Sequence, residues 1–224
     1  MDNPGMLLVL NDAPEWRENE FCQWCSEQFM PAMRCVPGIT EAWFYRAKVG
    51  GPAYLQVYYL SSLEVLLQPE YLRARGWGQS GNAAAQSMIS KSPNLIVGVY
   101  EHISTAPSSA SPDLGRVHAL LLVSLDMNRP ELKEEFEDWY RTEHIPNLGG
   151  SPGIQRAHRY GLVAHAADNQ GDPMNYAALY AAESLDAYET EEWYRRVRTP
   201  WMLRLYKYYV GRLRNRYELI CRAL

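Results

Sequence analysis

The chain has 224 residues, of which 47% are apolar and 21% are charged, and its formal net charge is -4. A chain of this length can form one large domain or two small ones, each with its own core. The slight acidity gives no reason to expect nucleic acid or an anionic membrane as a partner.

The N-terminus and the cysteines predict a cytoplasmic protein. The opening stretch MDNPGMLLVLNDAPEW starts with an acidic segment and holds only a short apolar run, so we expect neither a signal peptide nor a membrane span. The four cysteines are too few and too unevenly placed for a disulfide framework. Cys22 and Cys25 form a C-x-x-C pair within a predicted helix, where buried thiols are favoured over a zinc or redox role.

Two halves of the chain carry the same segments in the same order, which indicates an internal repeat. The stretch FCQWCSEQFMPAMRCVPGI (21–39) aligns without a gap on FEDWYRTEHIPNLGGSPGI (136–154), at a shift of 136 − 21 = 115, and six positions are identical. Three further pairs match: LLVLND (7–12) with LLVSLD (121–126), YLQVYYLSSLE (54–64) with YAALYAAESLD (176–186), and YEHI (100–103) with YELI (217–220).

The periodicity of these segments predicts β-α-β-β-α-β in each half, which is the ferredoxin-like order. Between the halves, the Pro- and Ser-rich stretch 104–115 has the composition of a linker, so we expect repeats over 1–103 and 116–224. The second half is predicted as strand 118–125, helix 129–145, strands 154–162 and 175–182, helix 184–197, an added apolar-basic helix over 199–215, and a final strand over 216–220.

A helix that ends in W-Y-x-x-E-H-x-P, followed by P-G-I and a strand containing R-Y, resembles the EthD-like and related stress-responsive families of the dimeric α+β barrel superfamily. The resemblance spans nearly the whole chain, twice. It implies an α+β fold in which two fused ferredoxin-like repeats form an intramolecular dimeric α+β barrel. It also places the families' helix-end histidine at His144. Because the first copy has Phe29 at the matching position, one functional site per chain is expected, in the second repeat.

The same residues suggest how that site is built. On a helix, His144 shares a face with Tyr140 and should point toward the sheet. On the following strand, a period of two puts Arg156, His158 and Tyr160 on the same face as Ile154, which we expect to be the covered face. The predicted catalytic residues are His144, His158 and Tyr160, and the predicted substrate-binding residues are Arg156, Tyr140, Tyr180 and His118.

This set predicts proton-transfer chemistry without a metal or other cofactor. An imidazole can take a proton and return it, a tyrosine or second histidine can hold an oxyanion, and an arginine can orient a carboxylate. We therefore expect a cofactor-independent lyase, by decarboxylation or elimination, acting on a small aromatic or polyketide-like acid. The alternatives are a cofactor-free monooxygenase or isomerase, and a non-catalytic ligand-binding or stress-related barrel. His144 could also simply cap its helix, and further homodimerisation stays open.

Overall fold

The computed structural model describes residues 4–15, 17–76, 83–109 and 111–224, and these form two compact units. Unit 1 comprises Met1–His102, Leu162–Pro173 and Leu219–Leu224, and unit 2 comprises Ile103–Gly161 and Met174–Glu218. Within the described residues, no helix combines the length and the apolar character that crossing a membrane requires. The fold class is mixed α+β, as predicted.

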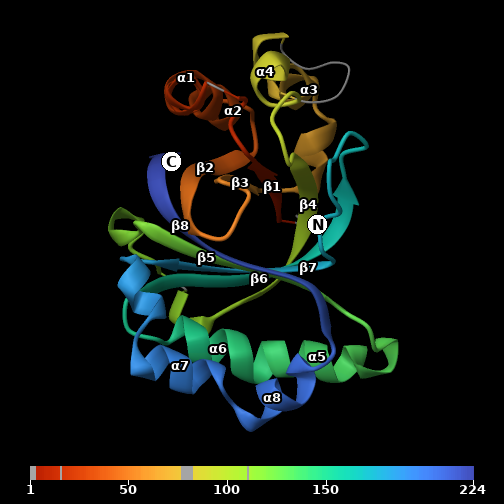
Figure 1. The fold of residues 1–224 in the computed structure, drawn as a ribbon, viewed down its shortest axis with the longest axis vertical. Helices are drawn as coiled ribbons and strands as arrows, with labels where there is room; N and C mark the ends of the chain where they lie inside the picture. Colours follow the sequence, from red (N-terminus) through yellow and green to blue (C-terminus); the bar gives the residue numbers. More distant parts are fainter. Residues whose placement is uncertain (1–3, 16, 77–82, 110) are drawn as a thin grey trace. The chain divides into compact units, whose positions relative to one another are not determined.

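Unit 1 has four antiparallel strands in the order β2-β3-β1-β4. Its helices gather on one side of its strands in Figure 1, where their apolar side chains build a core with the sheet. The elements are β1 (Gly5–Asn11), α1 (Glu18–Trp24), the π-helix η1 (Cys25–Phe29), α2 (Met30–Arg34), β2 (Ile39–Val49), β3 (Tyr54–Leu60), the 3-10 helix η2 (Leu63–Leu67), α3 (Pro69–Ala74), α4 (Ala83–Met88) and β4 (Ile96–Thr105).

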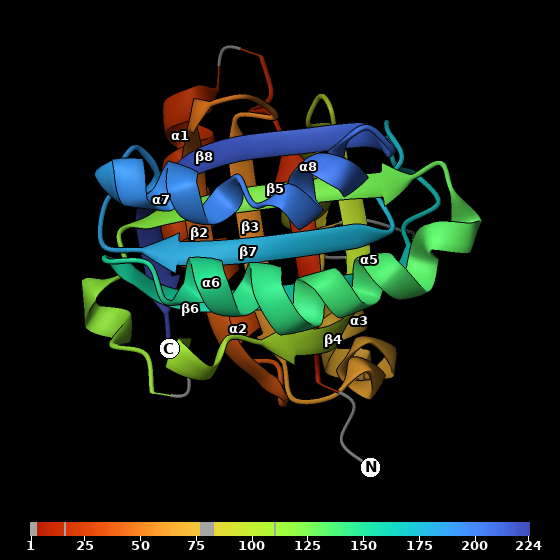
Figure 2. The ribbon, with the colours of Figure 1, turned by 90° about the horizontal axis from the view of Figure 1, so that it is seen from below.

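Unit 2 repeats this plan, with its strands in the order β6-β7-β5-β8. Its helices α5 to α8 cover one face of the sheet, and α5 and α6 run as one rod along β7 and β6 (Figure 2). The elements are β5 (Ala119–Met127), the 3-10 helix η5 (Pro130–Leu132), α5 (Lys133–Trp139), the π-helix η6 (Tyr140–His144), α6 (Ile145–Gly149), β6 (Ile154–His165), β7 (Tyr176–Ala182), the 3-10 helix η7 (Leu185–Tyr188), α7 (Glu191–Val197), α8 (Pro200–Tyr206) and β8 (Tyr209–Ala223).

The predicted added helix over 199–215 is wrong in its second part. Helix α8 ends at Tyr206 and strand β8 already begins at Tyr209. Aromatic and β-branched residues at 208–210 favour a strand over a helix, and Gly211 adopts a φ of 58°, which interrupts a helix. As a result, Arg212 and Arg214 lie on a strand next to β5.

The stretch expected as a linker is packed onto strand β6 over part of its length. Ala106 and Ser109 are buried. The Ala106 amide donates to the carbonyl of Ala157 at 2.9 Å, and the Ala157 amide donates to the Ser109 hydroxyl at 2.9 Å. This Pro- and Ser-rich stretch forms turns in the 3-10 helices Pro107–Ser109 and Leu114–Arg116, and it is part of unit 2.

Candidate active site

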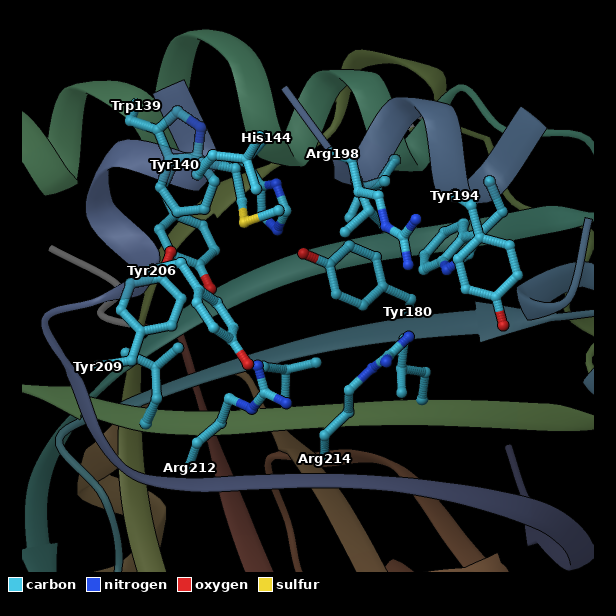
Figure 3. Close-up of a pocket in the computed structure, with 18 residues that line it drawn as sticks. Trp139, Tyr140, His144, Tyr180, Tyr194, Arg198, Tyr206, Tyr209, Arg212 and Arg214 are labelled. Atoms are coloured by element: carbon cyan, nitrogen blue, oxygen red, sulfur yellow. The ribbon is translucent and has the colours of Figure 1, made fainter. Parts of the chain in front are cut away.

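Unit 2 contains a cavity of about 290 Å³ between its helices and its sheet (Figure 3). Aromatic rings and aliphatic side chains form most of the wall, and three arginines contribute the charge. The lining residues are Leu121, Val123, Leu125, Trp139, Tyr140, His144, Leu148, Tyr180, Trp193, Tyr194, Val197, Arg198, Met202, Leu203, Tyr206, Tyr209, Arg212 and Arg214.

A π-helical turn places His144 in this wall. Residues 140–144 form one wide turn between α5 and α6, in which the Ile145 amide donates to the carbonyl of Tyr140. Pro146 explains the widening, because a proline in a continuous helix would lack its N–H and clash with the carbonyl four residues earlier. The matched proline of unit 1, Pro31, follows the equivalent π-turn over Cys25–Phe29. Such turns are rare in proteins overall, and those that occur are often found at functional sites.

His144 is buried among aromatic rings and keeps free hydrogen-bonding capacity. The residue is 8% exposed, and the centroid of its ring is 4.2 Å from that of Trp139 and 5.0 Å from that of Tyr140. In the described chain, Nδ1 has no hydrogen-bond partner. Burial, and then the nearby positive charge of Arg159, lowers the pKa of His144 to about 3. The imidazole is therefore neutral near pH 7 and can accept a hydrogen bond, and it gains a proton there only when a nearby anion compensates the new charge.

Tyrosine hydroxyls face the same space. The hydroxyl of Tyr180 points toward the His144 ring in Figure 3 and, like that of Tyr209, it has no hydrogen-bond partner among the described residues. Burial raises the pKa of both phenols well above the ordinary value and raises the pKa of Tyr140 to about 12. These hydroxyls therefore stay protonated and can donate to an oxyanion. Buried polar atoms without partners are uncommon in native proteins, so their convergence here indicates a site for a polar ligand group.

Glu143 fastens the π-turn to the helices that cover the cavity. Its carboxylate accepts a hydrogen bond from Trp139 Nε1 at 2.9 Å and from the Thr199 hydroxyl at 2.5 Å. Thr199 is the N-cap of α8, where its hydroxyl accepts from the Met202 amide at 3.1 Å. The indole that stacks on His144 and the helix that carries Met202 are thus held by one carboxylate.

The sequence-based face assignment of strand β6 is wrong because a β-bulge follows Ile154. Ile154 pairs with Ala182 and Arg156 pairs with Ala181, so two residues of β6 oppose one step of β7. This exchange of faces turns Ala157 and Arg159 toward the helices, in place of the residues at 156, 158 and 160. Arg156, His158 and Tyr160 lie on the opposite face and do not line the cavity.

The other predicted site residues divide between the cavity and the surface. Tyr140 and Tyr180 line the cavity together with His144. His118 is exposed just before β5 and does not line it. On the far face of the sheet, His158 Nδ1 lies 2.9 Å from the Thr105 hydroxyl and its ring centroid is 6.0 Å from that of Tyr160.

Arg159 is a buried cation near His144 that the sequence did not predict for this site. Its guanidinium carbon lies 4.2 Å from the ring centroid of Tyr140 and 4.9 Å from that of Phe136, and the residue is 1% exposed. It forms an ion pair with Glu137. A cation held in an aromatic cage this close to His144 disfavours the imidazolium and favours an anion in the cavity. The bulge at the start of β6, which has no sequence signature here, determines its direction.

Unit 1 has no imidazole at the position matched to His144. Phe29 occupies the position matched to His144 and stacks on Trp24, with ring centroids 4.9 Å apart. The hydroxyl of Tyr58, matched to Tyr180, already donates to Gln56 at 2.6 Å. The polar groups that lack partners in unit 2 are thus replaced or satisfied in unit 1.

The lining residues offer little to a metal ion. Among residues 4–15, 17–76, 83–109 and 111–224, no group of three or more His, Cys, Asp or Glu side chains could hold one. His144 is the lining side chain with strong metal-donor chemistry, and a single imidazole suffices as the axial ligand of a haem. If the protein binds a haem here, His144 is the residue that would hold it.

No family model matches the chain, and no curated protein matches it. The chain is similar to several solved structures. An anthrone oxidase-like protein matches with a TM-score of 0.67 and 12% identity, over 100% of this chain and 93% of its own. A "putative monooxygenase" from Fusobacterium nucleatum subsp. nucleatum matches with a TM-score of 0.67 and 9% identity, over 99% of this chain and 94% of its own.

A variant of chlorite dismutase from Candidatus Nitrospira defluvii matches with a TM-score of 0.56 and 10% identity, over 97% of this chain and 92% of its own. At such identities a likeness shows the fold alone, and the specific resemblance to EthD-like proteins stays a prediction. The chain has the mixed α+β fold of these proteins.

Proposed function

We propose that the cavity of unit 2 is the active site of a cofactor-independent enzyme that removes a proton from a flat aromatic substrate and then adds oxygen from O2. One observation carries this proposal. A neutral, buried imidazole without a hydrogen-bond partner on Nδ1 lies beside a tyrosine hydroxyl that also lacks one, among the described residues, in a cavity walled by aromatic rings. Aromatic walls suit a flat apolar ring system, and the two polar groups suit proton transfer next to an oxygen atom.

Anthrone illustrates the chemistry. His144 takes a proton from the methylene carbon while the Tyr180 hydroxyl donates to the ketone oxygen, on which negative charge develops. The carbanion then passes electrons to O2, a C–O bond forms, and the O–O bond breaks as water leaves. Anthrone and O2 give anthraquinone and water, so the reaction needs no added reductant.

The lowered pKa of His144 fits this role only if an anion stays close to it. Burial and Arg159 disfavour an isolated imidazolium. A carbanion or phenolate in the cavity would compensate the new charge, so proton transfer is favourable when substrate is bound and unfavourable in its absence. The names of the structural neighbours, an anthrone oxidase-like protein and a monooxygenase, support oxygenation as the reaction class.

A lyase that decarboxylates an aromatic acid is the second candidate, because Arg198, Arg212 and Arg214 line the cavity and could hold a carboxylate. For both candidate reactions, we propose that the chain consists of two fused ferredoxin-like repeats and that the second repeat holds the active site. A ligand-binding protein without turnover is the remaining alternative.

The test is to incubate the purified protein with anthrone or with 1-hydroxy-2-naphthoate, in air and under argon. Oxygenation predicts O2-dependent formation of anthraquinone, lost in Y180F and retained in H158Q, whose side chain lies on the other face of the sheet. Release of CO2 from the naphthoate under argon would establish the lyase instead. Binding without either product would leave a ligand-binding protein, and a Soret band in the purified protein would contradict cofactor independence.

A further inference from the structure

Three arginines reach the cavity from two elements. Arg198 follows the last residue of α7, and Arg212 and Arg214 are two residues apart on β8, where Arg214 pairs with Val123 of β5. All three contribute to the lining. In Figure 3, Arg212 and Arg214 extend from the strand side of the cavity toward the tyrosines, while Arg198 lies beside Tyr180 on the helix side.

These three arginines differ from their neighbours in having no ion-pair partner in the part of the chain that the structure describes. On the same or adjoining elements, Arg196 pairs with Glu192, Arg204 with Glu135, and Arg216 with Glu189. No carboxylate is among the described residues that line the cavity. Unlike Arg196, Arg204 and Arg216, the arginines at the cavity are therefore left without an anion in the described part of the chain.

Aromatic contacts hold two of these side chains at the cavity. The guanidinium carbon of Arg198 lies 5.7 Å from the ring centroid of Tyr194, and that of Arg212 lies 5.0 Å from the ring centroid of Tyr206. Stacking on a ring leaves the edge of a guanidinium free to donate hydrogen bonds. All three arginines are exposed, so water and salt weaken their mutual repulsion, and an anion that binds between them would interact favourably with each.

The positive charges of Arg212 and Arg214 influence the pKa values of tyrosines that line the cavity. Burial dominates the raised pKa of Tyr180, and Arg214 is among the cations that oppose that rise. Burial likewise raises the pKa of Tyr140 to about 12, and Arg212 is among the groups that oppose it. These guanidinium groups are thus close enough to the Tyr180 and Tyr140 hydroxyls to favour negative charge beside the candidate substrate position.

We propose that Arg198, Arg212 and Arg214 form a carboxylate-binding subsite, and that the substrate is a flat aromatic acid whose carboxylate lies between these arginines while its ring lies against His144 and Tyr180. Guanidinium groups bind carboxylates through paired hydrogen bonds, so the subsite fixes which edge of the ring faces the histidine. This inference rests on the proposed function only in taking the cavity as the substrate site.

The experiment compares 1-hydroxy-2-naphthoate with 1-naphthol, which lacks the carboxylate, by isothermal titration calorimetry. The wild type should bind the acid roughly tenfold to a hundredfold more tightly than the naphthol, as expected for charge-assisted hydrogen bonds. In R212Q/R214Q and R198Q/R214Q this preference should fall to about threefold or less, while naphthol affinity changes by about twofold at most. R204Q, which alters an arginine paired with Glu135 outside the lining, is the matched control and should keep the preference.

Equal affinity of the wild type for acid and naphthol would overturn the subsite, as would an undiminished preference in both double variants. These outcomes are separable from failure of the proposed function. Anthrone carries no carboxylate, so its oxidation can persist when the subsite is disproved, and arginine-dependent binding of the acid can persist when no oxidation occurs.

Discussion

The His144 ring packs against Trp139 at a centroid distance of 4.2 Å, with the ring planes tilted by 31°. At the matching positions of unit 1, the Phe29 ring stacks on Trp24 at 4.9 Å and 18°. In both pairs the tryptophan directly precedes a π-helical turn and the second ring belongs to the last residue of that turn, so the two units share one local structure and differ in whether the second ring can ionise. Each unit therefore supplies the side chain to introduce at the matching position of the other, which gives the substitutions H144F and F29H.

Acid should destabilise the protein through His144. Its folded-state pKa of about 3 lies below the unfolded value near 6.5, so protons bind the unfolded chain first as the pH falls. The contribution to stability is complete above about pH 6.5 and declines toward pH 3. Between about pH 7 and about pH 4.5 the loss should be about 3 kcal/mol.

Urea unfolding of wild type and H144F at the two pH values measures this loss. H144F lacks the titrating group, so its free energy of unfolding should fall less than that of the wild type by the same amount. Parallel pH dependences in the two proteins would show that the imidazole titrates normally.

The reverse substitution, F29H, should be harmful. Phe29 is 3% exposed in an apolar core, so a histidine there loses apolar burial and places an unpartnered imidazole among hydrocarbon. We expect a loss of about 2–4 kcal/mol at neutral pH. F29L, which stays apolar, should lose clearly less, and an F29H protein as stable as F29L would mean that unit 1 also accommodates a polar group at this position.

Removing Glu143 should loosen the cover of the cavity. E143A leaves Trp139 Nε1 and the Thr199 hydroxyl without their shared acceptor, which should lower stability by about 1–3 kcal/mol. E143Q keeps an acceptor oxygen and should recover most of that loss. E134A changes an exposed glutamate on α5, the helix that leads into the π-turn, and should stay within about 0.5 kcal/mol of wild type. Differential scanning calorimetry compares E143A, E143Q and E134A. Equal effects of E143A and E134A would show that the hydrogen bonds of Glu143 to Trp139 and Thr199 do not stabilise the protein.

Much of the arrangement around His144 could be predicted from the sequence. Helical spacing placed His144 with Tyr140, and the matched strands placed Tyr180 nearby, and all three line the cavity. Local period carries this information, because a regular helix or strand repeats its facing side chains. The π-turn keeps His144 on the covered side even though the helix is not regular there.

The remaining site residues depend on irregularities that periodicity cannot reveal. One bulge after Ile154 brings Arg159 to the helix side and takes His158 away from it. The change from helix to strand near Tyr209 brings Arg212 and Arg214 to the cavity, where a predicted helix gave them no defined direction. The bulge decides which charged groups of β6 face the helices, and the early start of β8 decides which charged groups of 209–215 line the cavity.

The central claim is that His144 removes the substrate proton, and the rate constant of anthrone oxidation under single-turnover conditions tests it most directly. H144F should bind anthrone with an affinity near that of the wild type, because the aromatic stack on Trp139 is kept. Its rate constant for anthraquinone formation should be lower by about 100-fold or more, as expected for loss of a general base. A folded H144F that binds anthrone and oxidises it at the wild-type rate would contradict the claim.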